Sequence, residues 1–124
     1  MFRATPVTLS RNPARYDLIL ASNLIDRLRQ PARFLRDVTP MLRQGGILVL
    51  SSPYTWLEDF TPKENWLGGV RENGEALTTL QALQRLLAAD FDLVDEPQDK
   101  PFVIRETARK FQHTLAQVTV WRKR

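Results

Sequence analysis

The sequence contains no cysteine and a single histidine, His113, among its 124 residues. Without cysteine, disulfides, thiolate nucleophiles and cysteine-based metal sites are excluded, and we expect no bound metal. Apolar runs are also short, and none approaches the roughly 20 residues that a membrane-spanning helix needs. The first residues are polar and interrupted by prolines, unlike a signal peptide. These absences predict a cytoplasmic chain that crosses no membrane.

The composition is that of an ordinary globular domain. Hydrophobic residues make up 43% and charged residues 26% of the chain, which at this length is enough to build one core. We expect residues 1–15 to form an irregular amino-terminal segment and residues 16–124 to form the domain.

The net charge is +4, and many of the excess cationic residues lie towards the end of the chain. The cations concerned are Arg105, Arg109, Lys110, Arg122, Lys123 and Arg124. Such an end either is a solvated tail or binds the phosphates of a nucleic acid. Because no zinc-finger pattern or RNA-binding aromatic strand accompanies it, we expect the solvated tail and no nucleic-acid partner.

Two compact apolar runs, at residues 16–22 and 47–52, predict strands. Their near-continuous hydrophobicity is typical of strands that are buried on both faces of a parallel sheet. Between them, Pro31 suits the first turn of a helix, and Pro40 predicts a break near the end of that helix. This strand–helix–strand unit predicts a right-handed parallel crossover.

A long, aromatic-rich connection follows at residues 53–77, and loops of this length are uncommon and usually functional. A second helix is predicted from Thr78, with Gln81 as the reciprocal partner in a capping box. Further strands are predicted at residues 91–96 and 115–121, the last one antiparallel. We therefore predict a three-layer α/β fold whose sheet is mostly parallel with a final antiparallel strand.

Two segments resemble class I S-adenosylmethionine-dependent methyltransferases. Residues 16–28, YDLILASNLIDRL, are similar to the fourth strand and following turn of that family. Residues 42–50, LRQGGILVL, resemble its L-x-P-G-G-x-L approach to strand five, with Gln44 where proline is usual. The resemblance implies a partial Rossmann-like sheet that corresponds to strands four to seven of the family.

Two longer segments resemble a narrower family, the methyltransferase domain of ovothiol-synthesising enzymes. They are residues 51–69, SSPYTWLEDFTPKENWLGG, and residues 101–113, PFVIRETARKFQH. That domain methylates a ring nitrogen of 4-mercaptohistidine with S-adenosylmethionine, so the resemblance implies this cofactor and a small histidine-derived substrate. The glycine-rich cofactor loop of the family has no counterpart before Tyr16, which predicts a chain that is inactive alone.

Open α/β sheets bind ligands beyond the carboxyl ends of their strands, so Ser22, Asn23 and Leu24 are the expected cofactor-binding residues. The resemblance implies that backbone carbonyls and the Asn23 amide face the methionine part of the cofactor. The competing interpretation is that Asn23 and Asp26 simply cap the turn.

The candidate substrate-binding residues are Tyr54, Trp56, Asp59, Lys63, Trp66 and Arg105. Aromatic faces suit an imidazole or a sulfonium, while Lys63 and Asp59 suit a substrate carboxylate and ammonium. The competing interpretation is that the aromatic residues hold the loop against the domain. The sequence identifies no catalytic base. His113 is a candidate for removing a proton from the acceptor nitrogen, and a purely structural role competes with it.

The expected sheet leaves the strand at residues 16–22 with a bare apolar edge, which favours pairing with another chain. We expect a homodimer, or a complex with a separate amino-terminal half, across this edge. The alternative to a methyltransferase fragment is a non-catalytic module that binds a small ligand or a partner through the aromatic loop at residues 53–69.

Overall fold

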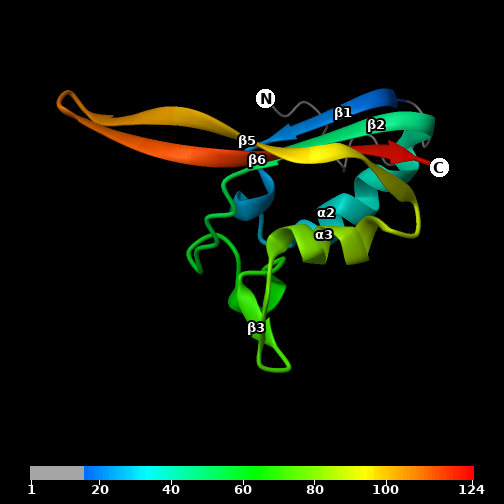
Figure 1. The fold of residues 1–124 in the computed structure, drawn as a ribbon, viewed down its shortest axis with the longest axis horizontal. Coiled ribbons are helices and arrows are strands. Elements are labelled where there is room, and N and C mark those ends of the chain that lie inside the picture. Colours follow the sequence, from blue (N-terminus) through cyan, green and yellow to red (C-terminus); the bar gives the residue numbers. More distant parts are fainter. Residues whose placement is uncertain (1–15) are drawn as a thin grey trace.

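The computed structural model describes residues 16–124, and of Ile104 and Glu106 the backbone alone. The irregular segment expected at residues 1–15 lies outside the described residues. A four-stranded sheet of order β1-β2-β6-β5 spans the molecule, with a separate small hairpin below it (Figure 1).

Three strands of the sheet run in one direction and the last runs against them. β1 (Tyr16–Ser22) and β2 (Leu42–Ser52) are adjacent and parallel, so the predicted parallel pair is present. β6 (Lys110–Lys123) lies between β2 and β5 (Phe91–Thr107) and is antiparallel to both. The final strand is therefore antiparallel, as predicted, and the fold is mixed α/β.

The first helix, α2 (Pro31–Val38), ends where the sequence indicated. It continues into a 3-10 turn, η2 (Thr39–Met41). Pro40 has no N–H to donate and its ring crowds the preceding turn, so the α-helical ladder stops there. The Thr39 hydroxyl donates instead to the Leu35 carbonyl at 2.7 Å.

The second helix, α3 (Thr79–Leu87), begins with the predicted capping box. The N–H of Gln81 donates to the Thr78 hydroxyl at 3.1 Å, and the N–H of Thr78 donates to Gln81 Oε1 at 2.9 Å. Two backbone donors that have no partner within the helix are thereby satisfied.

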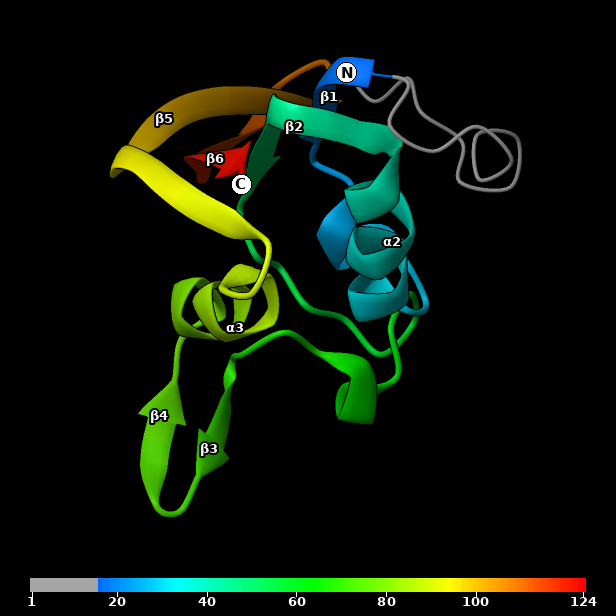
Figure 2. The ribbon, with the colours of Figure 1, turned by 90° about the vertical axis from the view of Figure 1, so that its right-hand side faces the viewer.

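Both helices lie on the same face of the sheet (Figure 2). The core lies between them and that face. Its buried members include Ile19, Ala21, Leu35, Val38, Met41, Leu48, Leu50, Leu83, Leu87 and Trp121. The described residues thus form two layers, whereas three were predicted.

The opposite face of β1 is exposed. Leu18 and Leu20 are 59% and 38% exposed, whereas Ile19 and Ala21, which alternate with them, are buried. Side chains alternate between the two faces of a strand, and both helices cover the same face. The prediction that this strand is buried on both faces is therefore wrong for the part of the chain that the structure describes.

The connection after β2 contains a hairpin that the sequence analysis missed. β3 (Val70–Glu72) pairs with β4 (Glu75–Leu77). Asn73 and Gly74 between them have φ values of 53° and 82°, the left-handed conformation that a two-residue hairpin turn of type I′ requires. The Asn-Gly dipeptide was the available signal. A 3-10 turn, η3 (Lys63–Asn65), precedes the hairpin.

The hairpin of β5 and β6 is much longer than the two strands predicted at residues 91–96 and 115–121. β2 pairs with β6 as far as Ser52 opposite Gln117. The remainder, residues 98–116, projects beyond the carboxyl end of β2 and is called the arm below (Figure 1).

Within residues 16–124, none of the helices has both the length and the apolar character needed to cross a membrane. The same residues contain no group of three or more side chains placed to hold a metal ion.

Candidate functional site

β1 and β2 end side by side at the carboxyl edge of the sheet. The N–H of Asn23 donates to the Ser51 carbonyl at 2.6 Å, with Asn23 in the left-handed region at φ 53°. Asn23 is exposed, and Ser22 and Leu24 are half-buried. Leu24 and Phe34 both line a hollow of about 240 Å³. The three expected cofactor residues thus lie at the edge where the sequence placed them.

Asp26 connects this turn to the loop after β2. Asp26 is 1% exposed, and its Oδ2 accepts from the Thr55 N–H at 2.9 Å and lies 3.5 Å from Arg27 Nη1. Arg27 Nη1 also donates to the Thr55 carbonyl at 3.0 Å. The turn η1 (Ile25–Arg27) has no side-chain cap. Asp26 therefore does not cap its own turn; it fixes where the aromatic loop begins.

Tyr54 connects the same loop to β6. Its hydroxyl donates to Gln117 Oε1 at 2.7 Å, and its N–H donates to Ser52 Oγ at 3.0 Å. Burial, and secondly the negative charge of Asp99, raise the pKa of Tyr54 far above its ordinary value of 10.0. Both effects disfavour the tyrosinate, so the hydroxyl stays protonated and keeps donating.

The indole N–H groups of both loop tryptophans are used inside the protein. Trp56 is 8% exposed, and its Nε1 donates to Thr79 Oγ1 at 3.0 Å. Trp66 Nε1 donates to the Thr61 carbonyl at 2.9 Å, and the Thr61 hydroxyl donates to the Leu28 carbonyl. These bonds fix the orientation of the rings. They also show that the tryptophans hold the loop in place, as the competing interpretation expected.

An open groove of about 850 Å³ lies between the aromatic loop, the β3–β4 hairpin and the start of α3. It is lined by Tyr54, Trp56, Lys63, Trp66, Gly69, Val70, Arg71, Ala76, Leu77, Thr78 and Thr79. Lys63 Nζ lies 5.9 Å from the centre of the Trp66 ring. Lys63 and Arg71 are cationic, and the described lining contains no carboxylate. The groove therefore suits a planar ligand that carries an anionic group.

Two glycines let the backbone pass close to the walls of this groove. Gly68 has φ 81°, and a Cβ added there would lie 2.5 Å from the Thr78 carbonyl carbon. Gly69 has φ 72°, and a Cβ there would lie 3.2 Å from Trp56 Cδ1. A larger residue at either position would be strained and would crowd the groove.

The groove brings together four of the six predicted substrate-binding residues: Tyr54, Trp56, Lys63 and Trp66. Asp59 is exposed and does not line it. Arg105 lies on the arm, where its Nε donates to the Thr107 carbonyl at 3.2 Å. His113 is exposed on the arm opposite Val103. Neither arm residue lines the groove.

Among the site residues that the sequence analysis missed, three have a specific role. Arg71 belongs to the groove through the β3–β4 hairpin, which the Asn-Gly signal at its turn would have indicated. Gln117 and Thr79 hold Tyr54 and Trp56. These partners are 63 and 23 residues apart in the chain, and no local pattern signals such a contact.

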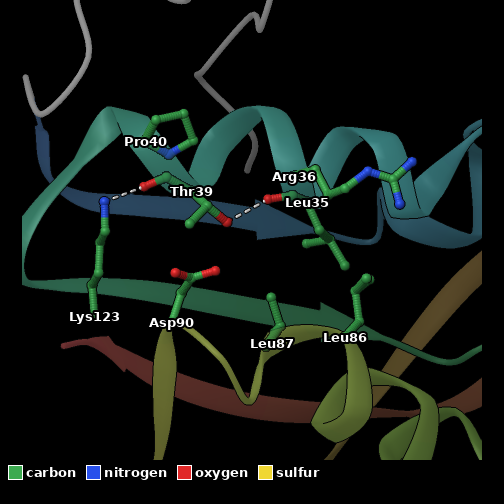
Figure 3. A pocket seen from close by; sticks show the side chains of 8 residues that line it. All are labelled: Leu35, Arg36, Thr39, Pro40, Leu86, Leu87, Asp90 and Lys123. Carbon is green, nitrogen blue, oxygen red and sulfur yellow. Dashed lines mark hydrogen bonds between the residues drawn. The ribbon is translucent and has the colours of Figure 1, made fainter.

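A second hollow, of about 260 Å³, lies between α2 and α3 at the amino edge of the parallel strands (Figure 3). Lys123 Nζ reaches across there and donates to the carbonyls of Thr39 at 2.7 Å and Leu42 at 2.9 Å. Arg124 Nη1 lies 3.4 Å from Asp92 Oδ1. These two terminal cations are bound to the domain, so the expectation of a solvated tail is wrong for them. Sheets of this kind bind ligands at the other edge.

Comparison with known proteins supports the fold. No family model and no curated protein matches the chain. A structure from a study of the conversion of a disulfide bond into a thioacetal group during echinomycin biosynthesis matches with a TM-score of 0.61 at 13% identity. The match covers 97% of this chain and 54% of that one.

A second match is the crystal structure of the selenomethionine-substituted CurJ carbon methyltransferase, with a TM-score of 0.51 at 19% identity. It covers 89% of this chain and 30% of that one. The chain thus has a methyltransferase-like fold and spans about half or less of the length of these proteins. The narrower resemblance to ovothiol-synthesising enzymes stays a prediction.

Proposed function

We propose that this chain is the acceptor-binding part of an S-adenosylmethionine-dependent methyltransferase domain, and that the groove holds the methyl acceptor. The position of the groove is the observation that carries the proposal. Its aromatic walls begin directly after β2, at the edge where such sheets bind ligands. Methyl transfer chiefly requires that acceptor and methyl donor are aligned and shielded from water, and walls held by buried hydrogen bonds suit that task.

As the acceptor we propose a ring nitrogen of 4-mercaptohistidine, which the resemblance to ovothiol-synthesising enzymes implies. An imidazole is planar and fits against the ring faces of Tyr54 and Trp66. Its amino-acid carboxylate would pair with Lys63 or Arg71. Asp59 remains the proposed partner of the substrate ammonium, from outside the groove lining.

The proposed cofactor site is only partly present in residues 16–124. Asn23 offers an exposed amide, and Leu24 lines the hollow next to it, so these residues fit one side of S-adenosylmethionine. No glycine-rich loop stands beside β1 among the described residues. We therefore propose that the 124-residue chain alone neither retains the cofactor nor transfers a methyl group.

The remaining strands would be added at the edge of β1. β1 is the edge strand of the described sheet, and Leu18 and Leu20 on it are exposed. An apolar edge of this kind pairs readily with another strand. We propose that a polypeptide supplying the glycine-rich half pairs there, with a second copy of this chain as the alternative occupant. Sedimentation of the 124-residue chain as a monomer, with rapid hydrogen exchange of its β1 amides, would exclude the second copy. Rapid exchange of the same amides when the glycine-rich half is supplied would exclude that half.

Calorimetry tests the proposed function. S-adenosylhomocysteine is titrated into the 124-residue chain and into the same chain extended by the segment encoded directly upstream of Met1. We expect binding by the extended form alone. Binding by the short chain would contradict the proposed absence of a complete cofactor site.

The acceptor site is tested separately, with 4-mercaptohistidine as the titrant. Lys63→Ala is expected to weaken binding about tenfold, since it removes a charged partner of the carboxylate. Lys100→Ala removes a cation that does not line the groove and serves as the matched control. Equal affinities of Lys63→Ala and the unaltered chain would refute the proposed acceptor site.

A second candidate function is a small-ligand binding module without catalysis. It is favoured by one observation: the described residues supply both aromatic and cationic walls of the groove, whereas they supply only one side of the proposed cofactor site. Unchanged affinity for 4-mercaptohistidine with and without S-adenosylhomocysteine, and no methyl transfer by the extended chain, would support this function over the first.

A further inference from the structure

One face of the arm carries an exposed apolar row. From base to tip, the antiparallel pairs on this face are Asp99–Gln117, Pro101–Leu115, Val103–His113 and Arg105–Phe111. Directly opposed residues of two strands share a face, and so do residues two apart on one strand. Val103, Phe111 and Leu115 are 54%, 52% and 59% exposed. Large apolar side chains gathered in this way mark an interaction surface.

The row belongs to the face of the sheet that the helices cover. Trp121 and Thr119 of β6 are buried on that face, and Gln117, next in the same alternation, accepts from Tyr54. Beyond Gln117 the strand passes the carboxyl end of β2, and the arm leaves the helices behind (Figure 1). The apolar row therefore begins beside the aromatic loop and runs outward from it.

The charge of the arm changes sign along its length, from negative at the base to positive at the tip. At its root the acidic side chains outnumber the basic ones: Asp95 and Glu96, which precede the arm on β5, and Asp99 at its base stand against Lys100. The sequence of its tip is basic, because residues 105–110 contain three cations, Arg105, Arg109 and Lys110, and one acidic residue. One end of an arm thus complements the other end of an identical arm. A partner of uniform charge would match only one of the two ends.

We propose that two copies of this chain associate through their arms, which lie face to face and antiparallel about a two-fold axis near Val103. Such an interface is self-complementary. It apposes Leu115 of each arm with Phe111 of the other and places each basic tip over the acidic base of its partner. A parallel arrangement would instead bring the two basic tips together. The tip of the second copy then lies beside Gln117 and Tyr54, next to the candidate site.

The absence of cysteine from the chain makes a crosslinking test direct. Val103→Cys lies near the axis, so mild oxidation of the full chain is expected to give a disulfide-linked dimer in high yield. Gln112→Cys lies on the opposite face of the arm and is exposed, so it is the matched control and is expected to stay monomeric on denaturing gels. Equal crosslinking of the two variants would overturn the proposal.

Sedimentation equilibrium provides the quantitative test. Phe111→Glu is expected to raise the dimer dissociation constant at least about tenfold, while Gln112→Glu adds the same charge to the opposite face and leaves it unchanged. Asp99→Arg and Arg109→Glu should each weaken the dimer, and their combination should restore it. Circular dichroism confirms that each variant is folded.

Three results would overturn the arm dimer. The first is a monomer at all accessible concentrations. The second is a dimer that Phe111→Glu leaves intact. The third is a dimer that Leu18→Lys disrupts and Phe111→Glu does not, which would assign the contact to the β1 edge. None of these measurements depends on the proposed methyl transfer, so the two proposals fail independently.

Discussion

The Tyr54 hydroxyl donates a hydrogen bond to Gln117 Oε1 at 2.7 Å, across 63 residues of sequence. This contact joins the start of the aromatic loop to the strand that carries the arm. Tyr54 also has φ 57°, in the left-handed region, which costs a non-glycine residue of order 1–3 kcal/mol. Its bonds to Gln117 and Ser52 are what hold it in that conformation.

Tyr54→Phe tests this contact. Removing the hydroxyl leaves Gln117 without its partner, and we expect the free energy of unfolding to fall by about 1 kcal/mol. Urea denaturation measures it, together with Gln117→Met and the double variant. The double-mutant cycle should give a coupling energy of at least about 0.5 kcal/mol. Strictly additive losses would mean that the two side chains do not interact in solution.

The raised pKa of Tyr54 predicts how stability changes in alkali. In the unfolded chain a tyrosine ionises near pH 10, while in the folded chain Tyr54 keeps its proton beyond that value. Above about pH 10 the folded state therefore binds more protons than the unfolded state, and the free energy of unfolding falls as pH rises. Below that pH this contribution is fully present.

The measurement is urea denaturation at several values between about pH 9 and 11, with Tyr54→Phe as the reference. The advantage of the unaltered chain over the variant should shrink as the pH rises through this window. An advantage that stays constant or grows would contradict the assigned direction of the pKa shift.

Gly68 and Gly74 form a matched pair for testing the groove. Both have positive φ, at 81° and 82°, so alanine is strained at either position. A Cβ at Gly74 meets nothing within 4 Å, whereas one at Gly68 lies 2.5 Å from backbone atoms at the start of α3. Gly74→Ala should cost about 1–2 kcal/mol, and Gly68→Ala clearly more. Thermal unfolding compares them, and equal costs would mean that α3 does not press against Gly68.

Asp26→Ala tests the link between the two strand ends. The substitution leaves the Thr55 N–H without its acceptor and removes the partner of Arg27. We expect a loss of about 1–3 kcal/mol. Asp37→Ala is the control, because the Asp37 side chain is 44% exposed and lies 3.9 Å from Arg33 Nε, so the loss there should stay below about 0.5 kcal/mol. Chemical denaturation distinguishes the two, and similar losses would count against the structural role of Asp26.

Several elements could be predicted because nearby residues decide them. The break of α2 at Pro40 follows from a missing N–H, and the start of α3 follows from two side chains three residues apart, Thr78 and Gln81. The β1–β2 pair was predictable because two apolar runs flank one helix and the crossover rule leaves a single arrangement. The predicted strands in turn located the carboxyl edge of the sheet, where the candidate site lies.

The tertiary structure alone decided which face each element uses and which distant groups meet. A continuous apolar run has the same sequence pattern whether one face of the strand is covered or both. The sequence therefore predicted that Leu18 and Leu20 are buried, whereas both helices lie on the other face of the sheet. Asp26 with Thr55, Tyr54 with Gln117 and Trp56 with Thr79 are contacts across loop closures. Such contacts depend on how the whole chain packs, and no local pattern of residues encodes them.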